Sequence, residues 1–240
     1  MAAHRIVPCI WLDDQAAAAA AGAALEPPRW KRAMPTSADA IIGLYERHAD
    51  AWDRGRAAAL TLERGWIERF VARLPAGGSV LDLGCGSGQP IARDLLERGF
   101  AVVGIDASPT LVARCRSRFP SAEWFVADMR TPSIDRRFDG LIAWDSLFHL
   151  GLEDQRAMFT TFRAHAAPGA VLLFTTGPEH GVAMGAFEGE PLFHASLAPS
   201  EYRALLAAHG FRVLAHVADD PACGRHTVWL AQREEREGGV

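Results

Sequence analysis

A glycine-rich turn directly after an apolar segment constrains this chain more than any other feature. Residues 80–83 read Val-Leu-Asp-Leu, which is apolar enough for a buried parallel strand with Asp82 as its single charge. Glycines follow at positions 84, 86 and 88. Glycine permits a tight turn and leaves no Cβ between the backbone and a ligand. The segment therefore predicts a strand that ends in a ligand-binding turn.

The glycine spacing separates this turn from the dinucleotide-binding fingerprint. That fingerprint is G-x-G-x-x-G, and its third glycine would fall at position 89, which is Gln. A second apolar segment, 101–105, ends in Asp106, 20 residues after Gly86. A carboxylate at this spacing can accept hydrogen bonds from both ribose hydroxyls. The alternative is that Asp106 serves the start of the next helix, which Ser108 is expected to cap.

Two more strands are predicted to end in acids. The segment 123–127 precedes Asp128 and Met129, and the segment 138–144 precedes Asp145, with His149 shortly after. Four consecutive strand ends thus carry a glycine turn or an acid. Because ligands of open α/β sheets bind at the carboxyl ends of the strands, these groups are expected around one crevice.

The motif at residues 80–88, together with these acids, resembles motif I and the following strands of the class I S-adenosylmethionine (SAM) dependent methyltransferases. The resemblance covers about residues 36–232. Helices expected at 152–165 and 199–209 alternate with strands at 170–175, 211–217 and 226–231. This pattern predicts a doubly wound α/β fold. The resemblance implies a mostly parallel seven-stranded Rossmann-like sheet with helices on both faces, its last strand antiparallel between the fifth and sixth.

The resemblance also implies that SAM is the cofactor. The residues expected to bind it are Tyr45, Arg56, Asp82, Gly84, Cys85, Gly86, Asp106, Ala107, Asp128, Met129, Trp144 and Asp145. Asp106 is expected at the ribose, and Asp128 and Met129 at the adenine.

Residues 36–76 are expected to form two helices that cover the cofactor. Apolar residues recur at helical spacing from about 37 to 52 and again from 57 to 73. In this reading Tyr45 and Arg56 lie at the methionine end of SAM. The alternatives are that Tyr45 belongs to a core-facing stripe and that Arg56 is solvated.

Histidines are the candidates for proton transfer. His149 follows the fourth strand and is the first choice for a general base, titrating between about pH 6 and 7.5. The segment 177–197 is long, rich in glycine and poor in helical periodicity, and is expected to be a substrate-binding loop that carries His180, Phe193 and His194. His194 and His180 are the alternative bases. Any of these histidines can instead be a hydrogen-bonded structural residue.

Composition bears on partners and compartment. The 240 residues are 49% hydrophobic, which is enough for a large core. Their net charge of −4 gives no electrostatic reason to expect a nucleic-acid partner. The four cysteines, Cys9, Cys85, Cys115 and Cys223, are scattered and predict free thiols in the cytoplasm. A nucleophilic Cys85 and a histidine-held metal are weaker alternatives; no metal is expected. A monomer or homodimer with a small-molecule partner and no membrane contact is the expected state.

Residues 1–35 are expected to be a poorly ordered extension. The alanine run at 16–21 is too short to span a bilayer. Residues 5–16 resemble the opening strand of PhnB-like proteins of the glyoxalase superfamily, but the rest of that module is missing and no activity is assigned to it. Residues 233–240 are expected to be a frayed tail.

The expected function is SAM-dependent methylation of an oxygen or a nitrogen of a small molecule. One alternative is a protein or RNA methyltransferase. The sequence after the fourth strand, residues 145–148, lacks the Asn/Asp-Pro-Pro-aromatic motif that is typical of amino-methylating RNA and DNA enzymes. The other alternative is a SAM-binding protein without catalytic activity.

Overall fold

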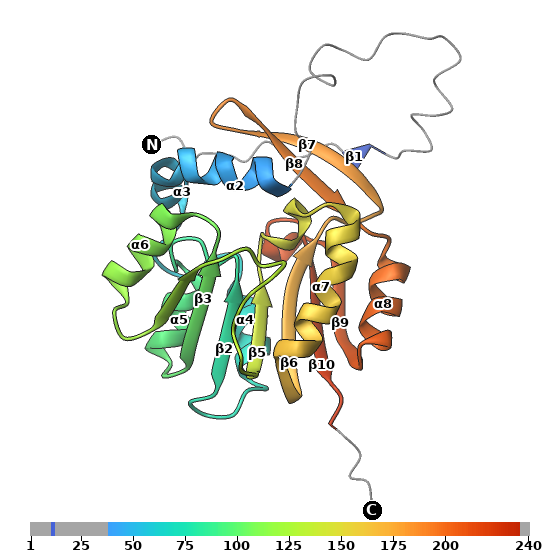
Figure 1. Ribbon diagram of the computed structural model, residues 1–240. Helices are drawn as coiled ribbons and strands as arrows, with labels where there is room; N and C mark the ends of the chain where they lie inside the picture. The colour runs from blue at the N-terminus through green and yellow to red at the C-terminus, as the bar shows by residue number, and fades with distance from the viewer. Residues whose placement is uncertain (1–10, 13–37, 236–240) are drawn as a thin grey trace, which may run out of the picture.

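A seven-stranded sheet forms the centre of the protein, seen in a computed structural model that describes residues 11–12 and 38–235 (Figure 1). The strand order is β4-β3-β2-β5-β6-β10-β9. The bounds are β2 Ser79–Leu83, β3 Ala101–Asp106, β4 Glu123–Val126, β5 Phe138–Ala143, β6 Ala166–Thr176, β9 Phe211–Asp220 and β10 His226–Arg233.

The topology confirms the predicted fold class. The pairings of β4, β3, β2, β5 and β6 are parallel, whereas β10 is antiparallel to both β6 and β9. β10 therefore lies antiparallel between the fifth and sixth strands, as the resemblance implied. Its residue Trp229 is fully buried against the core.

Helices cover both faces of the sheet because side chains alternate between the faces along each strand. On one face, α4 (Arg64–Val71), α5 (Ile91–Glu97) and α6 (Pro109–Arg118) pack on residues such as Val80. On the other, α7 (Leu152–His165) and α8 (Pro199–Ala208) pack on residues such as Leu81. Ser108 caps α6 as predicted, since its Oγ accepts a hydrogen bond from the N–H of Leu111 at 3.1 Å.

The predicted pair of lid helices is only partly correct. The first predicted helix is two short ones, α2 (Ala38–Arg47) and α3 (Ala49–Gly55), which lie above the carboxyl ends of the parallel strands (Figure 1). The second is the shorter α4. It does not cover this edge, because its side chains Ile67 and Phe70 are fully buried in the core of one sheet face.

Two groups of polar contacts hold the lid helices to α6. Glu46 on α2 accepts hydrogen bonds from the Ser108 hydroxyl and, at 2.7 Å, from the Thr110 hydroxyl. Asp53 on α3 pairs with Arg114 and, at 2.6 Å, with Arg118. The Arg118 bonds outweigh the effect of burial and hold the pKa of Asp53 well below its usual value. The lid is therefore anchored at the start and along the length of α6.

The segment 177–197 is a β-hairpin, so its prediction as a loop was wrong. β7 (Gly181–Phe187) pairs antiparallel with β8 (Glu190–Ser196) through a two-residue turn at Glu188 and Gly189. Both turn residues have positive φ, 49° and 81°, as hairpin turns of the type I′ class require. The hairpin extends over α2, and an ion pair of 2.6 Å joins Glu190 to Arg47 (Figure 1).

A two-residue strand, β1 (Trp11–Leu12), pairs with the outer edge of β7 and completes a three-stranded sheet. The rest of the predicted extension, and of the segment that resembles PhnB-like proteins, lies outside the described residues, as do positions 236–240. Within the part of the chain that the structure describes, every helix is too short or too polar to cross a bilayer.

A chain shortened to begin at Met34 is expected to keep its melting temperature and its cofactor affinity, because the described contact it loses is one short edge pairing of β1 with β7. Calorimetric melting of the full and shortened chains checks this. A drop of more than about 5 °C would contradict it, since for a domain of this size that corresponds to over 1 kcal/mol.

Candidate functional site

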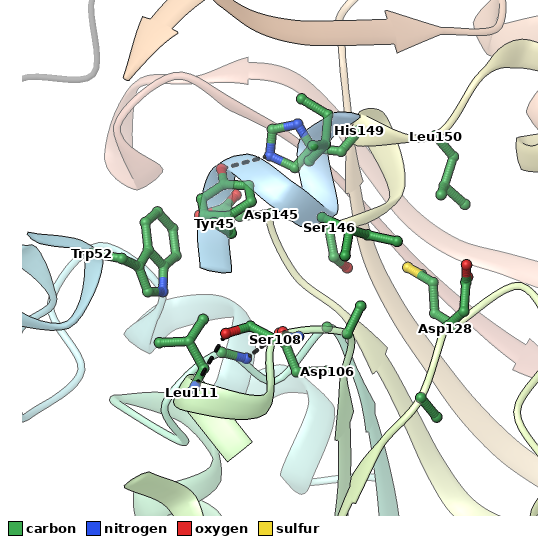
Figure 2. A pocket seen from close by; sticks show the side chains of 17 residues that line it. Tyr45, Trp52, Asp106, Ser108, Leu111, Asp128, Asp145, Ser146, His149 and Leu150 are labelled. Atoms are coloured by element: carbon green, nitrogen blue, oxygen red, sulfur yellow. Dashed lines mark hydrogen bonds between the residues drawn. The ribbon is translucent and has the colours of Figure 1, made fainter. Parts of the chain in front are cut away.

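A cavity of about 110 Å³ lies at the carboxyl edge of the sheet, under α2 and α3 (Figure 2). Residues from β2, β3, β4 and β5 and from the lid helices supply its walls. They are Ile41, Ile42, Tyr45, Trp52, Gly84, Gly86, Asp106, Ala107, Ser108, Leu111, Ala127, Asp128, Met129, Asp145, Ser146, His149 and Leu150. We call it the main cavity.

A smaller cavity of about 30 Å³ adjoins the main one across the glycine turn. Trp52, Gly84, Gly86 and Asp145 line both. Its other walls are Arg56, Asp82, Cys85, Gln89, Ile91, Ala92 and Trp144. We call it the side cavity. All twelve residues predicted to bind the cofactor therefore line one or both cavities.

The glycine turn has the geometry that glycine alone accommodates without strain. Gly84 and Gly86 have φ of 83° and 55°. A Cβ at position 84 would lie 2.5 Å from the Cβ of Ser146, so the turn after β2 packs directly against this side chain from the segment after β5. The N–H of Gly84 donates to the carbonyl of Ile105 at 2.8 Å, which ties the turn to β3.

Asp106 connects the end of β3 to the glycine turn. Its Oδ2 accepts from the N–H of Gly86 and its Oδ1 from the N–H of Ser108, both at 2.9 Å. Burial raises the pKa of Asp106, and these backbone bonds oppose the rise. Asp106 thus orders the start of α6, as the alternative predicted, and also lines the main cavity; its binding of the ribose stays a prediction.

Asp128 is held by its own neighbour. The guanidinium of Arg130 spans its carboxylate, with Nη2 at 2.6 Å from Oδ2 and Nε at 3.0 Å from Oδ1. Burial raises the pKa of Asp128, but the hydrogen bonds from Arg130 prevail and lower it. Arg130 is in turn fixed by Asp154 on α7 at 3.1 Å, so Asp128 is ionised and oriented.

Asp82 lines the side cavity, and its side chain is buried. Burial raises its pKa to about 7, with the charge of Asp106 adding to the rise and that of Arg56 opposing it. Asp82 is therefore divided between its two protonation states near neutral pH.

Tyr45 and His149 form a hydrogen-bonded pair that faces the main cavity (Figure 2). The Tyr45 hydroxyl lies 2.8 Å from Nε2 of His149, and Nδ1 of His149 lies 3.0 Å from the carbonyl of Phe193. A carbonyl only accepts, so Nδ1 carries the proton. Because burial keeps the ring neutral, Nε2 is unprotonated and accepts from the Tyr45 hydroxyl.

The expected titration of His149 between pH 6 and 7.5 does not fit this environment. Burial lowers its pKa to about 4, although the bond to Phe193 and the charge of Asp145 act in the opposite direction. His194 packs against it, with ring centroids 4.8 Å apart, and burial lowers the pKa of His194 to about 3. Both histidines are neutral at pH 7.

Of the three residues predicted to contact substrate, two lie close to His149, and all three lie outside the cavity walls. His194 and Phe193 are buried on β8 behind His149 and line neither cavity. Phe193 contributes its carbonyl to His149 and its ring to the contact between the hairpin and α2. His180 is exposed before β7 and lies outside both cavities, so the structure does not place it in this site.

Sequence reasoning missed several site residues. Ile41, Ile42 and Trp52 belong to the helical stripe of the lid, and only their position above the strand ends makes them site residues. His226 pairs with Asp145 at 3.0 Å from the start of β10. The predicted topology could have indicated His226, because an antiparallel strand begins at the edge of the sheet where its parallel neighbours end.

The described residues contain no group of three or more histidine, cysteine or acidic side chains arranged to hold a metal ion. Cys85, Cys115 and Cys223 are buried free thiols. The hydrogen bond with Cys115 and, after it, burial raise the pKa of Cys85, so it is a thiol at neutral pH, unlike an activated nucleophile.

Comparisons with known proteins agree with this geometry. Residues 52–216 match the family model described as a methyltransferase domain. The magnesium-protoporphyrin O-methyltransferase of Rhodobacter capsulatus is 32% identical over 120 residues, 46% of this chain and 51% of that protein. A dTDP-amino-sugar N,N-dimethyltransferase of Streptomyces venezuelae is 30% identical over 137 residues, 54% of this chain and 57% of that protein. The chain thus spans about half the length of these curated relatives.

A solved structure shares the fold over nearly the whole length. The 1,6-didemethyltoxoflavin-N1-methyltransferase of Burkholderia thailandensis, solved with its substrate and S-adenosylhomocysteine, superposes with a TM-score of 0.66 at 19% identity. The match covers 95% of both chains.

The sheet topology, the glycine turn and the acids at the strand ends define a nucleotide-binding α/β protein of the methyltransferase type. With the family match over most of its length, the chain belongs to the class I SAM-dependent methyltransferases.

Proposed function

We propose that this protein transfers a methyl group from SAM to an oxygen or a nitrogen of a small molecule. The observation that carries the proposal is the composition of the main cavity. Asp106, Asp128 and Asp145 line it beside the glycine turn, and its described walls include no lysine or arginine. Such walls fit a ligand with hydroxyl and amine donors and a positive charge. SAM has all three, in its ribose, its adenine and its sulfonium.

Each part of the cofactor has matching residues in this proposal. Asp106 and Ala107 hold the ribose, and Asp128 and Met129 the adenine. The glycine turn, Cys85 and the polar walls of the side cavity hold the methionine end; these walls are Arg56, Asp82, Trp144 and Asp145. Tyr45, on the lid helix α2, lines the main cavity.

When bound, SAM supplies a methyl group that is attached to a positively charged sulfur. The sulfur is the leaving group and becomes a neutral thioether. The protein then has to align the acceptor and exclude water. α2, α3 and the hairpin serve this purpose, because rings from all three pack together. Tyr45 lies with its ring centroid 5.1 Å from that of Trp52 and 5.7 Å from that of Phe187.

We assign the removal of the acceptor's proton to the pair Tyr45–His149. The Tyr45 hydroxyl receives the acceptor's proton as its own proton passes to Nε2 of His149, 2.8 Å away. The imidazolium that results keeps its Nδ1–H bond to the Phe193 carbonyl and is stabilised by the charge of Asp145. His194 supports this ring from behind and has no direct role.

The small-molecule acceptor is supported by the relatives and by the enclosure of the site. The curated relatives named above act, by their names, on a porphyrin and on a nucleotide-linked sugar. In this chain α2, α3 and the hairpin lie over the carboxyl ends of the strands, as suits a site for a small acceptor (Figure 1).

Titration calorimetry tests the cofactor directly. SAM and S-adenosylhomocysteine are expected to bind with Kd of about 1–100 μM, which corresponds to roughly 5.5–8 kcal/mol. NADH is the control, and its binding more tightly than SAM would overturn the proposal. Crystals soaked with S-adenosylhomocysteine should then show the nucleoside between Asp106 and Asp128.

A further inference from the structure

His226 reaches the site from a strand that the cofactor-binding motifs do not include. It is the first residue of β10. Because β10 runs antiparallel to β6, its first residue lies at the edge where the parallel strands end. The ring of His226 packs beside that of Trp144, with centroids 5.6 Å apart, next to the side cavity.

Both ring nitrogens of His226 face acceptors. Nδ1 lies 2.6 Å from the carbonyl of Cys223, and Nε2 lies 3.0 Å from Oδ1 of Asp145. Two acceptors require two N–H donors, so the ring is an imidazolium. Burial acts to lower its pKa, but the bonds to Asp145 and Cys223 prevail and raise it well above the usual value.

Asp145 is held in a fixed and unusual conformation at this point. Its φ is 52°, in the left-handed region that non-glycine residues rarely occupy. Its N–H donates to the Thr175 hydroxyl at 2.8 Å, and its Oδ2 lies 3.6 Å from Nη1 of Arg56. Burial acts to raise the pKa of Asp145, but the bond from His226 prevails and lowers it.

The position of Asp145 indicates which part of the cofactor it serves. It lines both cavities, whereas Asp106 and Asp128 line only the main one. The side cavity combines the acids Asp82 and Asp145 with the cation Arg56. An α-amino acid group is a zwitterion, and it needs one carboxylate partner and one cationic partner in a small polar space.

We propose that His226 is a positioning residue for the amino-acid end of the cofactor, acting through Asp145. It holds the Asp145 carboxylate in place to receive the α-ammonium group, and Arg56 serves the α-carboxylate. This inference rests on the proposed function, and it assigns a role to a residue outside the glycine turn and the lid.

Two ligands separate this role from a general structural one. S-adenosylhomocysteine has the amino-acid end, whereas 5′-methylthioadenosine has the same nucleoside and thioether without it. In the full-length variant His226→Gln, calorimetry is expected to show an approximately tenfold loss of affinity for S-adenosylhomocysteine, the scale of one charge-assisted bond. Affinity for 5′-methylthioadenosine should stay within about twofold.

The matched control is His209→Gln, a histidine beyond the end of α8 that bonds locally to the carbonyl of Leu205. It should change neither affinity. Asp145→Asn should reproduce the selective loss, and the double variant should lose no more than either single one, because both act through one contact. If circular dichroism shows that His226→Gln does not fold, the two affinities of Asp145→Asn still test whether Asp145 serves the amino-acid end.

Equal losses for both ligands in these variants would show a structural role and overturn the proposal, as would unchanged binding of S-adenosylhomocysteine. If the unsubstituted protein binds neither ligand, the proposed function itself fails. Failure of the proposed function is distinguishable from failure of this inference, because it is seen with the unsubstituted protein alone.

Discussion

Replacing His149 with glutamine is expected to lower turnover by about 10²–10⁴-fold and to leave SAM affinity nearly unchanged. Glutamine keeps much of the size of the side chain and some hydrogen bonding, but it cannot take up a proton. The hydroxyl of Tyr45, 2.8 Å from Nε2, would then have no base to receive its proton. Steady-state kinetics with an identified acceptor, together with calorimetry of SAM binding, measure the two effects separately.

The pH dependence follows from the low pKa of His149. The ring is active when neutral, so the contribution of His149 to turnover is lost as pH falls through about 4 and does not change from pH 6 to 8. The same shift affects stability. A histidine whose pKa is lowered on folding destabilises the native state once the pH falls below the pKa that it has in the unfolded chain. His149 should therefore favour unfolding as pH falls from about 6.5 to 4.

Tyr45→Phe is the matched control, because it removes the hydroxyl and keeps the ring contacts. A relay through Tyr45 predicts a loss of turnover of similar size in this variant. A fall of less than about fivefold in His149→Gln would show that alignment alone drives the reaction and that His149 is a structural residue.

Replacing Asp106 with alanine is expected to weaken SAM binding by one to two orders of magnitude, or about 1.5–3 kcal/mol. The proposed ribose bonds are lost, and the N–H groups of Gly86 and Ser108 lose their acceptor. The second effect disturbs the glycine turn, so the loss should approach the upper end of this range. Calorimetry measures the affinity, and thermal melting measures the damage to the fold.

Two further variants separate ribose binding from turn geometry. Asp106→Asn keeps one acceptor oxygen for the turn while removing the charge, and it should lose affinity with a smaller drop in melting temperature. Asp135→Ala removes an exposed acid from the loop before β5 and should change neither quantity. Unchanged affinity in Asp106→Ala would remove Asp106 from the proposed ribose site.

The sheet was predictable because β2 and β3 are mostly apolar, and glycine or an acid follows or ends each of the strands β2 to β5. The same strand ends predicted the cavity walls, since parallel strands bring them to one edge. The hairpin was not predictable in the same way. β7 reads Gly-Val-Ala-Met-Gly-Ala-Phe, in which small residues obscure the alternation, and its turn contains Glu188 at a positive φ where Asn or Asp is usual.

Tertiary context decided the remaining differences. α4 has the same amphipathic pattern as a lid helix, and only its packing shows that Phe70 is buried under the sheet. The low pKa of His149 arises from burial by α2 and β8, which are distant in sequence. His226 has no local motif at all, because its role depends on the strand that β10 lies beside.

The position of β10 between β6 and β9 has a consequence for how the protein is made. β6 and β9 do not pair with each other until β10 is inserted between them, yet β10 follows both of them along the chain. Until then β9 has no partner and the edge of β6 is unpaired, and unpaired edges of this kind favour aggregation. Because His226 arrives with β10, a nascent chain that already contains the glycine turn still lacks the histidine that pairs with Asp145.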